Sequence, residues 1–437
     1  MVIRILLVGN AAREHALAEA IKRSKHETKL YSYMKANNPG IAKFSEEFKI
    51  GSYSDLEAIR EFALKNSVEF AVVGPEEPLD KGVVDALEDS GIYAFGPKKN
   101  LAQIETSKGY TRELMKEYNI RGNPKFKVFT TMTGIEEFLA TLDGFVIKPD
   151  GLTGGKGVMV QGEHLITVPE ALEYCNSVLK THPAVVIEEK LEGEEFSLQC
   201  LTDGKTVIAT PPVQDHKRAY DGDKGPNTGG MGSYSCENHL LPFLTEKDIR
   251  EGLEITKDVA RALYAETGEL YKGVMYAGLI TTRNGVKLIE YNARFGDPEA
   301  MNVLSLLKTD FVDICKAIID GKLDKIKVEF SKKATVCKYA VPEGYPENPV
   351  KNKKVDINNI PKKAKVYFAS VDNKIDSLYM TGSRAIAVVG VADTLYEAEQ
   401  IAEMSIKKIK GPVFYRSDIG TKQLISKRIR HMNRLRK

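Results

Sequence analysis

The chain has 437 residues, of which 42% are hydrophobic and 28% charged, as in globular proteins with a sizeable core. Its length corresponds to about three domains of ~150 residues. Lysine and arginine total 63 against 60 acidic residues, a near balance that argues against binding nucleic acid or membranes by charge alone. We expect neither a signal peptide nor a membrane span. Five scattered cysteines without a Cys-x-x-Cys pair favour the reducing cytoplasm.

Apolar runs alternate with amphipathic segments through the first hundred residues. The run over 2–8 is typical of a strand buried on both faces of a parallel sheet. A helix is predicted over 13–23, and further strands are predicted over 29–33, 69–73 and 92–95. This alternation predicts a doubly wound α/β domain, whose ligands lie beyond the carboxyl ends of the strands.

The first predicted turn, Gly9-Asn-Ala-Ala-Arg-Glu-His15, lies at that edge. It is not G-x-G-x-x-G, and no convincing acidic residue ends the second strand, so NAD binding is disfavoured. A helix N-terminus beside Arg13 suits a simple anion better. The loops 37–40 and 74–78 are expected at the same rim, although each alone is also explained by turn chemistry.

Residues 146–158 predict a hairpin with a glycine-rich tip. Glycine lets backbone N–H groups approach an anion closely, and lysines at both ends add positive charge. This pattern favours a polyphosphate site. Because it is not a Walker A motif, an ordinary loop with solvated lysines is the alternative. The residues concerned are Lys148, Gly151, Gly154, Gly155, Lys156 and Gly157.

Two further segments carry polar patterns. A predicted strand over 184–191 ends in acids, which suits either an adenine and ribose site or a solvated strand end. Residues 214–234 form a predicted long polar loop, and such loops are usually functional or disordered. The interleaved Asp215, Lys217 and Asn227 favour recognition of a charged small molecule over disorder.

Two predicted strands flank an Asn-Gly turn, and the second strand carries a spaced polar set. Glu290, Asn292 and Arg294 are two residues apart and should share one face. Ile289 and Tyr291 should take the other face. Two oxygen ligands beside a cation suit Mg²⁺ with phosphate. The alternative is the solvent face of an amphipathic strand.

The remaining residues predict a small α+β unit. Strands and a helix over 395–409 alternate within 331–420. The basic end, 427–437, is interpreted as a solvated helix end rather than a nucleic-acid arm, and we assign it no function.

Five motifs together resemble the phosphoribosylamine–glycine ligases (glycinamide ribonucleotide synthetases) of de novo purine synthesis, within the ATP-grasp superfamily. The order of lysine, glycine hairpin, acid-ended strand and Glu-x-Asn strand is that of the ATP-grasp fold. The resemblance spans nearly the whole chain, and its fourth motif is the most specific. The motifs are Gly9-Asn-Ala-Ala-Arg-Glu-His-Ala16, Val73-Gly-Pro-Glu-Glu-Pro-Leu79, Asp150-Gly-Leu-Thr-Gly-Gly-Lys-Gly157, Gln214-Asp-His-Lys-Arg218 with Gly225-Pro-Asn-Thr-Gly-Gly-Met-Gly232, and Asn292-Ala-Arg-Phe-Gly-Asp-Pro-Glu299.

The resemblance implies an α/β and α+β multidomain protein. Residues 1–104 would form an N-terminal α/β substrate-binding domain. Residues 105–330 would form the ATP-grasp domain, with a mobile lid at about 122–187. Residues 331–437 would form a small C-terminal α+β domain with its basic tail.

The implied reaction joins glycine to 5-phosphoribosylamine through glycyl phosphate, with ATP and Mg²⁺ or Mn²⁺ as cofactors. The metal pair would be Glu290 and Asn292. Arg294 is predicted to be catalytic, with Asp215 and Lys217 orienting the substrates. The implied ATP-binding residues are Lys108, Lys148, Gly154, Gly155, Lys156, Gly157, Glu188, Glu189, Leu191 and Glu195. The predicted substrate-binding residues are Gly9, Asn10, Arg13, Asn227 and Asp297.

Two departures from the family pattern matter. Ala11 and Ala12 replace glycines of the first turn, which puts a tight phosphate approach there in doubt. Gly278 stands where related enzymes place another metal ligand. A different ATP-grasp ligase and a non-catalytic nucleotide-binding protein are the competing interpretations. We expect a monofunctional cytoplasmic monomer that binds neither nucleic acid nor membrane.

Overall fold

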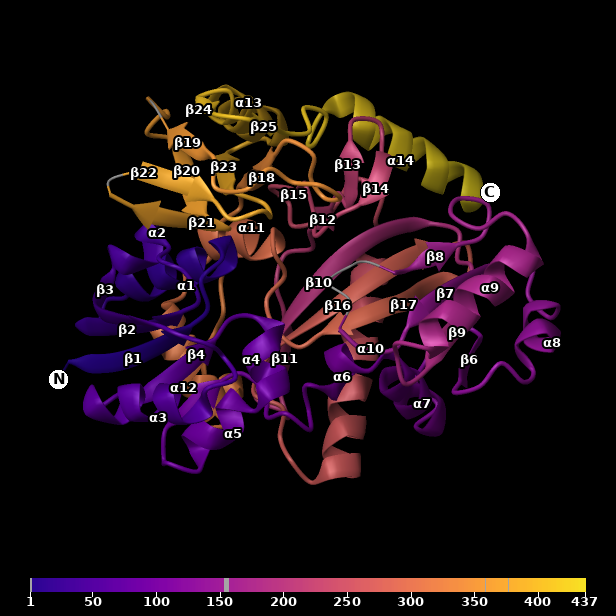
Figure 1. Cartoon of the computed structure of the whole chain (residues 1–437), viewed down its shortest axis with the longest axis horizontal. Coiled ribbons are helices and arrows are strands. Elements are labelled where there is room, and N and C mark those ends of the chain that lie inside the picture. The colour runs from indigo at the N-terminus through magenta and orange to yellow at the C-terminus, as the bar shows by residue number, and fades with distance from the viewer. Residues whose placement is uncertain (1, 153–156, 358, 376) are drawn as a thin grey trace.

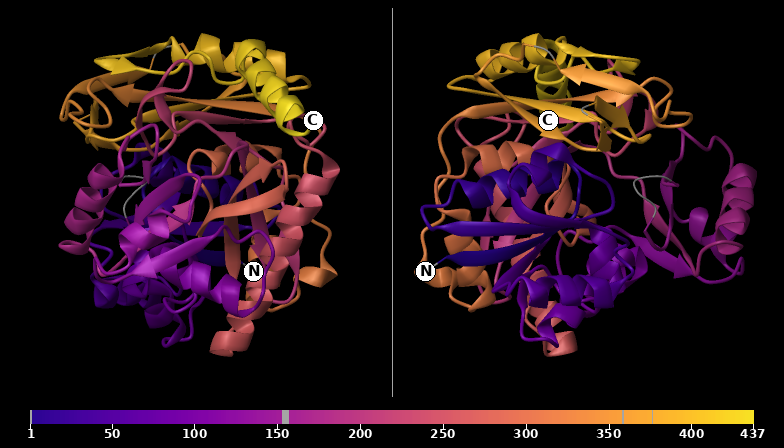
Figure 2. Two further views of the ribbon diagram at one scale, coloured as in Figure 1. Left: turned by 90° about the vertical axis from the view of Figure 1, so that its right-hand side faces the viewer. Right: turned by 60° about the vertical axis from the view of Figure 1, so that its left-hand side comes forward.

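A computed structural model of the chain describes residues 2–152, 157–357, 359–375 and 377–437. The N-terminal layer and a small four-stranded unit lie at opposite ends of the molecule (Figure 1). The C-terminal strands form a further layer above the N-terminal and central parts (Figure 2). Within the described ranges, no helix is long and apolar enough to cross a membrane.

The N-terminal layer is a parallel sheet of order β3-β2-β1-β4-β5, which confirms the doubly wound prediction. Its order reverses beside β1, so the loops after β1 and β4 open a crevice at their carboxyl ends. The polar edge strand β3 escaped prediction. The elements are β1 (Ile3–Val8), α1 (Ala12–Lys22), β2 (Thr28–Met34), α2 (Pro39–Ala42), β3 (Ser45–Ile50), α3 (Leu56–Lys65), β4 (Phe70–Val73), α4 (Glu76–Lys81), α5 (Val83–Glu88) and β5 (Tyr93–Phe95).

The central part is an antiparallel sheet of order β11-β10-β16-β17, with the long helix α10 packed against it. The predicted hairpin around the Asn-Gly turn is confirmed as β16–β17. The elements are α6 (Gln103–Thr106), α7 (Lys108–Glu117), β10 (Glu194–Thr202), β11 (Val207–Ala209), α10 (Glu246–Thr267), β16 (Gly273–Thr282), β17 (Gly285–Asn292), α11 (Glu299–Leu306), α12 (Phe311–Ile319) and η1 (Leu323–Lys325).

A second antiparallel sheet, of order β6-β9-β7-β8, forms a separate unit that we call the lid. Its buried residues make a hydrophobic cluster of their own, apart from the large core of the chain. The predicted hairpin is present, with Val146 opposite Val160. The elements are β6 (Phe126–Phe129), α8 (Ile135–Leu139), β7 (Phe145–Pro149), β8 (Met159–Val160), α9 (Val168–Leu179) and β9 (Val185–Glu189).

The segment 214–234 is not the long irregular loop that its composition suggested. It forms two short strand pairs, β12 with β15 and β13 with β14, and β15 also pairs with β18 of the C-terminal sheet. Polar residues form strands here because neighbouring strands supply the backbone partners. The elements are β12 (Gln214–Asp215), β13 (Arg218–Tyr220), β14 (Lys224–Asn227) and β15 (Gly232–Ser235).

The C-terminal part is α+β, as predicted, with a main sheet path of β12-β15-β18-β23-β20. The basic tail is helical, as expected, but its inner side is docked rather than solvated: Met432 is buried and Arg428 contacts two carboxylates. The elements are β18 (Ala334–Pro342), β19 (Lys354–Ile357), β20 (Ala364–Phe368), β21 (Val371–Lys374), β22 (Ser377–Met380), β23 (Ile386–Ala392), α13 (Leu395–Ile406), β24 (Ile409–Lys410), β25 (Val413–Phe414) and α14 (Lys422–Leu435).

Candidate active site

One cleft of about 970 Å³ is lined by the N-terminal layer, the central sheet, the lid and the C-terminal part. Twelve of the predicted residues line it: Arg13, Lys108, Lys148, Glu188, Glu195, Asp215, Lys217, Asn227, Glu290, Asn292, Arg294 and Asp297. Five described ones do not, namely Gly9, Asn10, Gly157, Glu189 and Leu191. Gly154, Gly155 and Lys156 lie outside the described residues.

The site face of β17 carries Glu290 and Asn292, as the spacing predicted. The pairing with β16 shifts at Leu279, so Ile289 has no partner and forms a β-bulge. The bulge shifts the alternation of the strand, so that Leu288 and Tyr291 are buried while Ile289 and Glu290 are both half-buried beside the cleft. The predicted placement of Ile289 on the far face is therefore wrong. Tyr291 does lie on the far face, where its hydroxyl contacts Thr256 on α10 at 3.1 Å.

Glu290 lies among cations. Its Oε1 is 3.5 Å from Lys217 Nζ. Although burial favours the protonated acid, Lys217, Lys148 and Lys108 lower the pKa of Glu290 to about 2. Burial likewise opposes protonation of Lys217, but Glu290 and Glu195 raise its pKa. Both groups are therefore charged at neutral pH.

Arg294 is held by groups from three elements. Its guanidinium lies 2.8 Å from Glu105 Oε1 and 3.2 Å from Glu76 Oε2, and it donates to Asn292 Oδ1 at 3.2 Å. Burial raises the pKa of Glu105 to about 7, although Arg294 opposes this shift. Burial favours the protonated form of Glu76 as well. The positive charges of Arg294 and Arg13 outweigh the effect of burial and lower the pKa of Glu76 to about 2. These contacts hold the planar guanidinium of Arg294 in one orientation, which sets the direction of its N–H donors.

Lys148 belongs to a buried three-residue network. Its Nζ lies 2.8 Å from Glu188 Oε2 and donates to the carbonyl of the bulged Ile289 at 3.0 Å. Arg112 forms a bidentate pair with the same carboxylate at 2.8 and 3.0 Å. Burial lowers the pKa of Lys148, while Glu188 opposes this shift. The Glu188 side chain thus anchors a lysine at the cleft wall.

Asp215 lies beside another acid. Burial and the nearby Glu299 raise the pKa of Asp215 well above its ordinary value, although Lys217 opposes the shift. Glu299 itself is buried and accepts a hydrogen bond from Tyr276 at 2.7 Å. Burial next to a second carboxyl group thus disfavours ionisation of Asp215, so its side chain can hold a proton at the cleft wall.

At the N-terminal rim, Arg13 reaches the cleft and donates to the Phe295 carbonyl at 3.0 Å. The Ala11 amide is already engaged, since it donates to Glu14 Oε2 at 2.7 Å. Ala11 has a φ of −96°, so alanine is unstrained there. Gly9 is the position that requires glycine, because its φ is +136° and an added Cβ would lie 2.3 Å from the Glu14 Cγ.

Two predicted substrate residues are committed to protein contacts. Asn10 lies behind the rim, where its Oδ1 accepts from the Tyr53 hydroxyl at 2.7 Å. Asp297 lines the cleft, but its carboxylate accepts from Tyr339 at 2.6 Å and lies 3.2 Å from Arg384. Arg384, from the C-terminal part, also donates to the Asp297 carbonyl at 2.7 Å.

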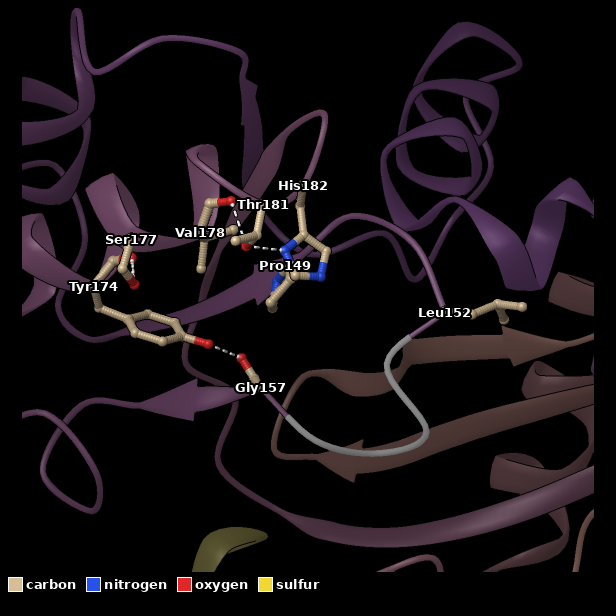
Figure 3. A pocket seen from close by; sticks show the side chains of 8 residues that line it. All are labelled: Pro149, Leu152, Gly157, Tyr174, Ser177, Val178, Thr181 and His182. Carbon is tan, nitrogen blue, oxygen red and sulfur yellow. Dashed lines mark hydrogen bonds between the residues drawn. The ribbon is translucent and has the colours of Figure 1, made fainter.

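The described ends of the glycine hairpin are tied to neighbouring helices. Lys108, at the start of α7, donates to the Gly151 carbonyl at 2.9 Å, and Asp150 accepts from the Gly109 amide at 3.1 Å. At the other end, the Tyr174 hydroxyl donates to the Gly157 carbonyl at 2.6 Å, beside a separate lid cavity of about 340 Å³ (Figure 3). Gly157 therefore lines this lid cavity and not the main cleft.

The Glu290–Asn292 pair fits a divalent cation by its donor chemistry. A carboxylate and an amide oxygen share one face, and Mg²⁺ commonly takes one or two such ligands with phosphate and water. Gly278 is opposite Glu290 in the sheet and adds no side chain. The expected set of two protein ligands therefore fits the described geometry.

Several cleft residues were missed by sequence reasoning. They come from elements distant in the chain, and no spacing pattern links them to the predicted set. Glu76 and Glu299 lie inside motifs quoted above, so proximity to those motifs was the available signal. The missed residues are Glu76, Glu105, Arg112, Tyr276, Glu299 and Arg384.

Comparison with known proteins identifies this architecture. Family models of phosphoribosylglycinamide synthetase match its N domain at residues 3–105, its ATP-grasp (A) domain at 106–300 and its C domain at 335–422. The phosphoribosylamine–glycine ligase of Methanocaldococcus jannaschii is 52% identical and aligns over 100% of both chains. That of Methanosarcina barkeri is 50% identical over 99% of this chain and 100% of its own.

Solved structures show the same overall fold. The crystal structure of the phosphoribosylamine–glycine ligase of Thermotoga maritima matches with a TM-score of 0.80 at 29% identity, covering 95% of this chain and 100% of its own. Biotin carboxylase of Campylobacter jejuni shares the fold alone, with a TM-score of 0.74 at 13% identity, 99% of this chain and 98% of its own being covered.

Fold and cleft together define an ATP-grasp enzyme, of a class that uses ATP and a divalent metal. More specifically, the chain belongs to the phosphoribosylglycinamide synthetase family.

Proposed function

We propose that this cleft joins glycine to 5-phosphoribosylamine at the expense of ATP, giving glycinamide ribonucleotide, ADP and phosphate. The observation that carries the proposal is the convergence of Lys148, Lys217, Glu290, Asn292 and Arg294 on one cleft. That set suits phosphoryl transfer, in which the protein supplies position and charge neutralisation.

The chemistry requires two steps. A carboxylate is a poor electrophile with no usable leaving group, so the glycine carboxylate first takes the γ-phosphoryl group of ATP and releases ADP. The amine of 5-phosphoribosylamine then attacks the carbonyl carbon of glycyl phosphate and expels phosphate. Arg294 would neutralise charge on the transferring phosphoryl oxygens. Its fixed contacts with Glu76 and Glu105 support this role.

The ATP side of the cleft is assigned as follows. Lys148, and Lys108 once freed from Gly151, would bind phosphates. The exposed carboxylate of Glu195 would accept hydrogen bonds from the ribose. The backbone near Glu188, Glu189 and Leu191 would face adenine, since the Glu188 side chain is already paired. The loop 151–157 would cover the nucleotide and exclude water from the acyl phosphate.

Glu290 and Asn292 would hold the divalent metal, which we propose to be Mg²⁺ or Mn²⁺. The ion would supply charge neutralisation at the ATP phosphates. Lys217 would orient glycine once Glu290 turns toward the metal; the present contact between Lys217 and Glu290 supports this assignment. Asp215 would hold or accept a proton near the amine, because its raised pKa lets it exchange one.

The phosphate of 5-phosphoribosylamine is assigned to the N-terminal rim at Arg13. Gly9 and Asn10 would shape this rim from behind, through turn geometry and the Tyr53 contact. Asn227 would contact a substrate directly, since it lines the cleft. Asp297 would act by holding Arg384 in place.

We also propose the domain boundaries 1–104, 105–330 and 331–437, with the lid at about 122–187, for a monomer in the cytoplasm. The separate hydrophobic cluster of the lid supports its independence. Limited proteolysis with and without ATP, and size-exclusion chromatography with light scattering, would test these points.

One assay tests the function. The protein is incubated with ATP, Mg²⁺, glycine and freshly generated phosphoribosylamine, and ADP and glycinamide ribonucleotide are measured. We expect both products in equal amounts, dependent on both substrates. Formation of AMP, or ADP release that does not require glycine, would refute the proposal.

A further inference from the structure

The last helix, α14, lies almost entirely beyond the family C-domain model, which ends at residue 422. It runs past the β13–β14 hairpin (Figure 1), and beyond its last turn Arg436 lies 2.7 Å from Asp248 of α10. One side of it remains exposed, including Arg430 and Arg434, whereas Leu424 and Met432 are buried. The docked side faces the central domain, so the helix is more than a solvated end.

Two side chains of α14 contact one buried carboxylate. Arg428 lies 3.2 Å from Glu194 Oε2, and His431 Nδ1 lies 2.6 Å from Glu194 Oε1. The Glu194 side chain is only 4% exposed. Glu194 begins β10 and directly precedes the cleft residue Glu195, whose carbonyl accepts from Gln214 at 3.1 Å. The helix therefore anchors the start of the strand that carries Glu195.

The same guanidinium reaches the hairpin. Arg428 lies 2.6 Å from Asp223 Oδ2, at the turn between β13 and β14. Asp223 has a φ of +61°, an uncommon conformation for a residue other than glycine. Arg416 also contacts this carboxylate, at 3.2 Å, and donates to the Arg218 carbonyl at 3.0 Å. The hairpin turn is thus fixed from the C-terminal side.

The β13–β14 hairpin in turn contacts the lid and lines the cleft. Arg218 in β13 forms an ion pair with Glu163 of the lid, and Asn227 in β14 lines the cleft. His216, between Asp215 and Lys217, is 1% exposed, and burial with the charges of Arg416 and Arg428 lowers its pKa to about 3. Arg428 therefore also lies close to the segment that carries Asp215 and Lys217.

We propose that α14 is a positioning element of the active site and that it acts through Arg428. The guanidinium joins the strand that carries Glu195 to the hairpin that carries Arg218 and Asn227. Its two terminal nitrogens pair with Glu194 and Asp223, whereas its buried Nε has no hydrogen-bond partner among the described residues. Because both terminal nitrogens are engaged where the side chain lines the cleft, Arg428 is a positioning residue rather than a catalytic one. This inference rests on the proposed function, since it assigns Arg428 a part in that reaction.

The test compares Arg428→Ala with Arg430→Ala, a matched control on the exposed side of the same helix. A placement error of ~1 Å at a reacting group can cost about 100-fold in rate. We expect Arg428→Ala to lower kcat/KM for ATP by about 10- to 100-fold, and to weaken ADP binding measured by calorimetry. Arg430→Ala should stay within about twofold of wild type, as surface changes away from contacts do. Thermal unfolding identifies the temperature range in which each variant is folded.

Two further variants keep the proposal falsifiable. Asp223→Asn weakens the contacts that Arg428, Arg416 and Lys427 make with the hairpin turn. Arg428 keeps Glu194 and Arg416 keeps Asp418, so neither buried guanidinium is left unpaired. This variant tests the hairpin contact if Arg428→Ala does not fold, and a loss of kcat/KM is again expected. Arg428→Lys keeps one cation and should restore part of the loss. The proposal is overturned if folded Arg428→Ala, or Asp223→Asn in its place, matches Arg430→Ala in both kcat/KM and ADP affinity. Wild-type protein that makes no glycinamide ribonucleotide would instead refute the proposed function, while ADP binding would still test Arg428.

Discussion

Lys217 Nζ and Glu290 Oε1 face each other across the cleft at 3.5 Å. Glu290→Gln keeps the size of this side chain but removes the charge that a divalent ion requires. We expect turnover to fall by about 100-fold or more with the fold retained. The measurement is ADP formation against Mg²⁺ concentration. Glu254→Gln, on the surface of α10, is the control. A wild-type metal titration for Glu290→Gln would remove Glu290 from the metal site.

Lys148→Met should weaken ATP binding. The substitution removes a cation that faces the cleft, while Arg112 continues to pair with Glu188 and limits the loss of stability. The affinity for ATP is measured by calorimetry at a temperature where the variant is folded. Lys116→Met, at the exposed end of α7, serves as the comparison. Equal affinities for ATP in Lys148→Met and Lys116→Met would contradict the phosphate-binding role of Lys148.

Arg294→Lys should lower kcat more than it raises KM for ATP. Lysine retains the charge but cannot contact Glu76, Glu105 and Asn292 together, so donation toward the phosphoryl group loses its direction. Loss of one such donor costs about 10²–10³ in kcat. Steady-state kinetics provide the measurement, with Arg283→Lys in the exposed turn as reference. An unchanged kcat would contradict the assignment.

Glu105 predicts a pH dependence of stability. Its pKa is raised to about 7 by burial, so between its ordinary value and about 7 the folded protein holds a proton that the unfolded chain has released. The contribution of this group to stability therefore falls as pH rises through that window. Relative to Glu105→Gln, the unfolding temperature of wild type should decrease from about pH 5 to about pH 8. A constant difference would show that Glu105 titrates normally.

The first turn predicts a large loss of stability for one substitution and a small loss at most for another two residues away. Gly9→Ala should destabilise the protein by roughly 3 kcal/mol or more, because its φ is +136° and Glu14 fills the space of a Cβ. Ala11→Gly should cost at most about 1 kcal/mol, since Ala11 is unstrained at φ −96°. Denaturant unfolding measures both. A gain of stability in Gly9→Ala would contradict the geometry.

The periodic parts of the fold were predictable. Buried parallel strands such as 2–8 read as apolar runs, and the Asn-Gly turn marks its hairpin, because local sequence dictates both. The pairing of β15 with β18 was not predictable, since β18 lies a hundred residues further along the chain. The bulge at Ile289 also escaped, because the sheet register creates it and not the residue type.

The sequence by itself determined the chemical groups of the site and their local order: the glycine hairpin, the Glu290–Asn292 pair and the motifs that carry the family resemblance. Only the tertiary structure decided how these groups are held. Glu76 and Glu105 fix Arg294, Arg112 shares Glu188 with Lys148, and α14 reaches Glu194 and Asp223. Ion pairs between distant segments depend on where packed elements place two charges within a few ångströms, and no spacing along the chain records that distance.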